Sequence, residues 1–235
     1  MLNKWFGDLQ TRLAAEECTV VRDFCCAASA VLKTYCDAAV RSLEGEPKIL
    51  PATALLRIIC EFVTTFLWCT HATTEQEFES NLGLWQRYSA WEKKRMHKEL
   101  LPTVDTYTKK IFDSEMARLD KIVGKAEAPK DMPKIRKRFE VLKGVFGYDI
   151  YARSYLQFNP AVHIDYHVLT STTKHMGNQL CFEGDWDEDI DKLKLHCLSS
   201  VYYFVRGIFG QYNWDCTEMD NVFAQIAAQP NAQSR

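Results

Sequence analysis

Apolar side chains recur at intervals of three or four residues along most of the chain, and polar side chains fill the positions between them. This is the period of the α-helix, while runs of alternating β-branched residues, which would indicate strands, are absent. The pattern predicts an all-α protein, a helical bundle of about eight helices. We expect one domain over residues 1–228 and a disordered tail over 229–235, because the tail is rich in Gln, Pro, Asn and Ser.

The first predicted helix runs from Leu2 to about Leu43 and is ended by Gly45-Glu46-Pro47. The stretch from Ala52 to about Ala72 is apolar nearly all round, as expected of a central helix with others packed about it. In the first helix the apolar positions are spaced by three, four or seven residues, which predicts one buried stripe; they are Leu9, Leu13, Val20, Phe24, Ala27, Val31, Tyr35 and Ala39.

A long region from Thr74 to Val123 is predicted to form an extended helical arm or an added hairpin. Thr74 with Glu77 three residues later fits a capping box at its start, and Pro102 bends or breaks the helix that begins there. The Gly and Pro content of residues 124–133 then predicts a hinge.

Five more helices are predicted towards the C-terminus, and Gly177 to Asp189 is expected to be a polar, turn-rich segment. Asn159 caps a helix and Pro160 tolerates its first position, so we expect a helix from there to about His175, with a kink as the alternative. The other predicted helices run from Pro133 to near Gly144, from Tyr148 to Phe158, from Asp189 through Phe209, and from about Thr217 to Ala228.

Composition and charge narrow the classes of partner. Lys and Arg total 29 against 31 Asp and Glu, so the net charge of -2 gives no global attraction to a nucleic acid. Local basic runs at 92–98 and 130–143 are either solvated helix faces or patches for a polyanion. The most apolar segment, Ile58 to Cys69, is interrupted by Glu61, so we expect no membrane span.

The nine cysteines are predicted to be reduced. Their number is odd, no secretory leader precedes them, and several lie in apolar helical stretches, where a thiol packs as a small hydrophobe. A cytoplasmic location is therefore expected.

Two charged residues interrupt the most apolar helix. Arg57 and Glu61 lie four residues apart on one face, and either charge buried alone would cost several kcal/mol in rough terms, so each is expected to be the other's partner. The pair is either an internal ion pair that fixes helix packing or one side of a polar site. Both interpretations stay open at this stage.

A second polar group lies between Tyr155 and His167. If one helix continued through it, Tyr155, Asn159, His163 and His167 would align at four-residue spacing. The two histidines have the spacing of metal ligands, with Asp165 or Glu61 as a third, but a core histidine satisfied by Glu61 or by a backbone carbonyl fits as well. No cofactor is expected.

An Arg-x3-Glu helix with a later Tyr-x3-Ser/Asn-x3-His segment resembles a bacterial family of uncharacterised helical proteins, a domain of unknown function. The chain matches at five positions, with Asn159 where serine is usual: Arg57, Glu61, Tyr155, Asn159 and His163. That family is similar to the HEPN superfamily, helical bundles that often dimerise and often act as metal-independent ribonucleases in toxin or phage-defence systems. In the superfamily an arginine is followed after four to six residues by histidine, whereas Arg153 and His163 here have nine residues between them.

The sequence leaves three hypotheses of function. The resemblance implies an RNA-binding or RNA-cleaving protein, a homodimer in the manner of the superfamily, with the five matched residues as its catalytic site. The second is a non-catalytic helical interaction or scaffold protein that binds a partner protein and uses the same residues as a buried polar network. The third is a metal-dependent enzyme that uses His163 and His167.

Overall fold

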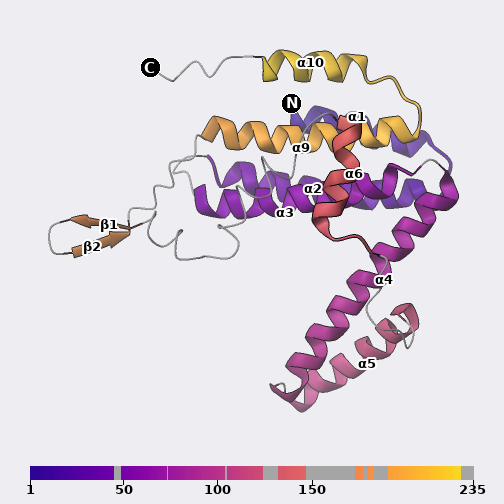
Figure 1. Ribbon diagram of the computed structural model, residues 1–235, viewed down its shortest axis with the longest axis vertical. Helices are drawn as coiled ribbons and strands as arrows, with labels where there is room; N and C mark the ends of the chain where they lie inside the picture. Colours follow the sequence, from indigo (N-terminus) through magenta and orange to yellow (C-terminus); the bar gives the residue numbers. More distant parts are fainter. Residues whose placement is uncertain are drawn as a thin grey trace. The chain divides into compact units, whose positions relative to one another are not determined.

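The computed structural model describes residues 1–44, 49–72, 74–103, 105–123, 132–146, 173–176, 179–182 and 190–228, with the backbone alone at 144–146, 173–176, 179–182 and 227 (Figure 1). It confirms the all-α class. Contacts divide the chain into two compact units, which we call the core unit (Met1–Thr70 with Phe139–Arg235) and the hairpin unit (His71–Arg138). The prediction of a single domain stays a prediction.

The core unit is built around α3 (Ile49–Thr70), which packs against both α2 (Val20–Arg41) and α9 (Ile190–Gln211) (Figure 1). Phe66 on α3 stacks on Phe24 at 5.4 Å between ring centroids and lies 4.4 Å from Phe204. The apolar residues of α3 face neighbours on several sides, as the sequence predicts for a central helix.

By length and composition, α3 could also cross a membrane. Inside the protein, however, 56% of its most apolar window is buried. The core helix of a globular protein passes the same test, and the packing of α3 between α2 and α9 corresponds to that case.

The predicted helix from Leu2 to Leu43 is wrong, because it is two helices, α1 (Leu2–Ala15) and α2. Glu16 has an extended backbone, and the side chain of Thr19 caps α2 by accepting a hydrogen bond from the backbone N–H of Arg22 at 3.1 Å. The break shifts the helical phase. The buried face of α2 therefore consists of Val21, Cys25, Ala28, Ser29, Leu32, Cys36 and Ala39, while Val31 and Tyr35 of the predicted stripe are exposed.

Another helix, α10 (Thr217–Ala227), packs on α9. The ring of Tyr202 stacks on Phe223 at 4.0 Å, and its hydroxyl donates to Asp220 at 2.8 Å. The predicted boundaries of the last two helices agree closely with those of α9 and α10.

The hairpin unit consists of α4 (Glu75–Leu100), a single 3-10 turn (Leu101–Thr103) and the antiparallel α5 (Thr106–Val123). Thr74 caps α4 as predicted, because its hydroxyl accepts a hydrogen bond from the N–H of Glu77 at 3.1 Å, which is one half of a capping box. The apolar contact between the helices is small and centres on Ala90, Leu119 and Val123. The next helix, α6 (Ile135–Phe146), belongs partly to each unit.

A two-stranded antiparallel hairpin, β1 (Thr173–Met176) and β2 (Gln179–Phe182), contradicts the predicted helix end at about His175. Gly177-Asn178, between the strands, is a dipeptide typical of tight hairpin turns, so a local signal was present. The predicted helix from Tyr148 to Phe158, the rest of the helix after Asn159, most of the hinge 124–133 and the tail 229–235 lie outside the described residues.

Candidate functional site

Arg57 and Glu61 form the predicted ion pair. The guanidinium Nη1 of Arg57 donates to the Glu61 carboxylate, across one turn of α3. The two partners differ sharply in exposure, because the Arg57 side chain is 9% exposed and that of Glu61 is 45% exposed. A sealed guanidinium therefore holds a carboxylate that solvent can reach.

The surroundings of the pair explain this asymmetry. Arg57 lies beside the buried Leu56 and Cys60 on a helix whose other faces pack on α2 and α9. Burial raises the pKa of the Cys60 thiol to about 12, which shows how strongly this environment disfavours an anion, and the positive charge of Arg57 opposes that rise. The Arg57 charge is tolerated here because Glu61 compensates it.

The pair has limited chemical options. The exposed part of the Glu61 carboxylate can accept a hydrogen bond or a proton from a group outside the helix, and Arg57 restricts its rotamer. An arginine already engaged by a carboxylate has less to offer a phosphate. Arg57 is therefore better suited to positioning Glu61 than to binding a polyanion directly.

The other three predicted site residues, Tyr155, Asn159 and His163, lie outside the described residues, as do Arg153, Asp165 and His167. Whether these groups meet Glu61 stays a prediction. Within the described part of the chain, no group of three or more His, Cys, Asp and Glu side chains could hold a metal ion. The metal hypothesis depends on the residues beyond it and also stays a prediction.

The basic run at 92–98 is largely balanced by acids within the hairpin unit. Lys93 pairs with Glu115 at 2.6 Å, and Lys94 pairs with Asp120. Arg95 reaches Glu92 at 3.0 Å. This helix face is thus of mixed charge, which favours the interpretation of the run as a solvated helix face.

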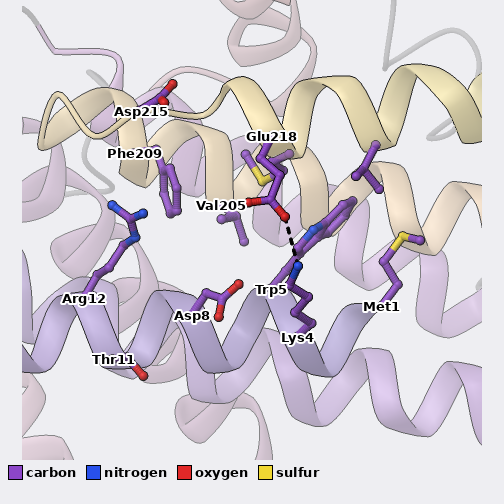
Figure 2. A pocket seen from close by; sticks show the side chains of 12 residues that line it. Met1, Lys4, Trp5, Asp8, Thr11, Arg12, Val205, Phe209, Asp215 and Glu218 are labelled. Carbon is purple, nitrogen blue, oxygen red and sulfur yellow. Dashed lines mark hydrogen bonds and ion pairs between the residues drawn. The ribbon is translucent and has the colours of Figure 1, made fainter.

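A cleft of about 730 Å³ in the core unit was not anticipated from the sequence. Its walls come from α1, α9, the segment after α9, and α10 (Figure 2). Lys4, Asp8 and Arg12 line the cleft from α1. Their four-residue spacing, which places three charged side chains on one face of that helix, was the local sequence signal for it.

Comparisons of the chain with protein-family models, with curated proteins and with solved structures gave no match. The resemblance to a HEPN-like family rests on five sequence positions. Of these, the structure describes Arg57 and Glu61.

Proposed function

We propose that the protein binds and cleaves RNA without a metal ion, as a HEPN-like component of a bacterial defence or toxin system. The observation that carries the proposal is the half-exposed Glu61 carboxylate, held in place by the buried Arg57 on the central helix. The motif resemblance at Tyr155, Asn159 and His163 supports it from the sequence.

The chemistry needs two proton transfers and a source of positive charge. A base takes the proton of the RNA 2′-hydroxyl while the 2′ oxygen attacks phosphorus, and an acid gives a proton to the departing 5′ oxygen. We assign one of these transfers to His163 and the orientation of its ring to Glu61. Since Arg57 is engaged by Glu61, stabilisation of the phosphorane is assigned to Arg153, and Arg57 becomes a positioning residue.

The test is cleavage of a mixed pool of structured and single-stranded RNAs in EDTA. Glu61→Gln keeps the shape of the side chain but cannot ionise, and we expect it to lower the rate by roughly a hundredfold or more. The matched control is Asp37→Asn, which removes the acid of another i,i+4 pair in the core unit, with Lys33 at 2.6 Å. It should cleave like the wild type.

Folded wild type that leaves every RNA intact would contradict the proposal, as would full activity in Glu61→Gln. Circular dichroism of each variant separates loss of activity from loss of fold.

A second candidate is the non-catalytic interaction protein, and two observations favour it. Arg57 is sealed and engaged by Glu61, as in a pair that only fixes packing. The hairpin unit also exposes four large apolar side chains by 46 to 76%, namely Met96, Leu100, Tyr107 and Ile111, which is a feature of binding surfaces.

For this candidate the double variant Arg57→Met/Glu61→Leu is decisive. Replacing an ion pair that only fixes packing by apolar groups of similar volume should leave the free energy of unfolding unchanged within about 1 kcal/mol, or raise it. A purely structural pair also predicts an inactive wild type in the RNA assay. Active wild type combined with an inactive, stable double variant would exclude this candidate.

A further inference from the structure

The cleft between α1 and α10 exists because these helices barely meet. They are linked across it by one ion pair between Lys4 and Glu218 at 3.0 Å, and both of those side chains are well exposed. α10 is held instead by α9, through Tyr202 and through Asp220, which Arg206 contacts at 3.2 Å. The space left over α9 has the volume of sites that take small organic molecules.

The floor of the cleft is apolar. Trp5 comes from α1, and Val205 and Phe209 come from α9 (Figure 2). Met219 comes from α10. Each of these side chains is less than a tenth exposed, so each is fixed by packing on its other sides. A rigid floor of this kind suits an aromatic or branched aliphatic group.

Five charged side chains line the rim, and three of them are already engaged. Lys4 and Glu218 pair with each other. Asp215 accepts hydrogen bonds from the hydroxyl and then the backbone N–H of Thr217, at 2.6 and 2.9 Å, and these lower the pKa of its carboxyl. The remaining two are Asp8 and Arg12.

Asp8 and Arg12 are opposite charges four residues apart on α1, a spacing at which such side chains commonly pair. Within the described part of the chain, no ion pair joins them to each other or to another residue, and each has only a longer-range charge interaction, Asp8 with Lys4 and Arg12 with Asp215. Both reach from α1 towards the opening (Figure 2). The Arg12 guanidinium lies 5.1 Å from the ring centre of Phe209 and 5.6 Å from that of Trp214, so both rings help to hold its side chain beside the cleft.

We propose that this cleft binds a zwitterionic amino acid with a large apolar side chain. The ligand carboxylate pairs with Arg12, where a planar guanidinium can donate two parallel hydrogen bonds. The ligand ammonium donates to Asp8, and the apolar side chain lies on the floor formed by Trp5, Phe209 and Met219. The site is separate from Arg57 and Glu61 and does not depend on the proposed RNA function.

A matched set of ligands tests each part of this assignment on the full chain. L-Phenylalanine carries both charges, 2-phenylethylamine carries only the cation, 3-phenylpropionate carries only the anion, and glycine has no apolar group. In isothermal titration calorimetry to about 10 mM ligand, we expect L-phenylalanine to bind about tenfold or more tightly than either single-charge analogue, and glycine to give no heat.

Two variants separate the charges. The affinity of Asp8→Asn for L-phenylalanine should fall to that of the wild type for 3-phenylpropionate. The affinity of Arg12→Gln for L-phenylalanine should fall to that of the wild type for 2-phenylethylamine. Asp37→Asn, away from the cleft, should bind as the wild type does. Since Asp8 and Arg12 are both exposed, the variants should fold, which circular dichroism checks.

No binding by folded wild type would overturn the proposal. So would equal affinity for L-phenylalanine and 3-phenylpropionate, which would make the cleft a site for apolar carboxylates, or equal affinity for L-phenylalanine and the amine. Affinity unchanged in both variants would place the amino acid elsewhere.

Discussion

The core unit and the hairpin unit are both helical, but they are held together by different interactions. In the core unit, large side chains such as Phe6, Phe66 and Phe204 are essentially without solvent exposure. In the hairpin unit the apolar contact between α4 and α5 centres on three residues, and ion pairs such as Lys93–Glu115 and Lys94–Asp120 connect the helices beside it. Burial therefore dominates the first unit, and charge contributes a larger share in the second.

This difference predicts different responses to solvent. Salt screens exposed ion pairs, whereas apolar burial has no charge interaction for salt to screen. The cysteines offer a selective probe, since none of the nine lies between residues 71 and 138. Labelling of buried thiols thus reports opening of the core unit alone.

The largest effect is expected from Phe66→Ala, which removes a fully buried ring between Phe24 and Phe204. The free energy of unfolding of the core unit should fall by about 3 to 5 kcal/mol. Urea unfolding followed by labelling of buried thiols measures it.

The control in the other unit is Tyr107→Ala, because that side chain is 76% exposed and should change the free energy of unfolding of the hairpin unit by no more than about 0.5 kcal/mol. Since the thiols do not report on this unit, its unfolding is followed by the fluorescence of Trp85 and Trp91 in a chain whose other four tryptophans are replaced by Phe. Equal effects of the two substitutions would remove the distinction between the units.

A smaller effect is expected from Gly207→Ala, where α9 packs closely on Leu67 of α3. A Cβ at this position would overlap the Cδ2 atom of Leu67, which is 2% exposed and has little room to move. The overlap should cost about 1 to 3 kcal/mol in the free energy of unfolding.

Gly210→Ala on the same helix is a close control, since nothing lies within 4 Å of its Cβ position. It should stabilise α9 by up to about 1 kcal/mol, through helix propensity alone. If both variants were stabilised, the close packing of α3 on α9 would be in question.

The smallest effect concerns pH and the hairpin unit. Hydrogen bonds from Arg118 and then Lys93 lower the pKa of the Glu115 carboxyl from 4.5 to about 2. Because the folded-state pKa is depressed, the contribution of this carboxylate is present above pH 4.5 and is lost as the pH falls towards 2.

The hairpin unit should therefore lose stability over this pH range. Thermal unfolding measures this loss through the fluorescence of Trp85 and Trp91, in a chain whose other four tryptophans are replaced by Phe. Glu115→Gln should reduce that loss, while Glu99→Gln, whose carboxylate contacts Arg95 only at 3.5 Å, should change it less. Identical pH profiles in the wild type, Glu115→Gln and Glu99→Gln would show that the Glu115 carboxylate contributes nothing measurable to the stability of the hairpin unit.

Features fixed by local chemistry could be predicted from the sequence. The cap made by Thr74 with Glu77, and the pairing of Arg57 with Glu61, each depend on residues within one turn. The apolar residues on nearly every side of the predicted helix from Ala52 to Ala72 likewise identified α3 as the central helix. These signals need no knowledge of the remaining chain.

Features that depend on phase or on tertiary contact were missed. Because the short extended segment before Thr19 changes the helical phase of α2 relative to α1, the predicted stripe included Val31, which is 44% exposed, in place of Leu32, which is buried. The cleft beside Asp8 and Arg12 requires α9 and α10, whose residues are some two hundred positions away in the sequence. No local pattern on α1 could place those walls.

Mass spectrometry of the ends of RNA incubated with the protein in EDTA tests the proposed function most directly. Attack by the 2′ oxygen leaves a 2′,3′-cyclic phosphate on one fragment and a free 5′-hydroxyl on the other, and the account predicts both ends with wild type and neither with Glu61→Gln. Intact RNA, or fragments that carry a 5′-phosphate, would contradict it.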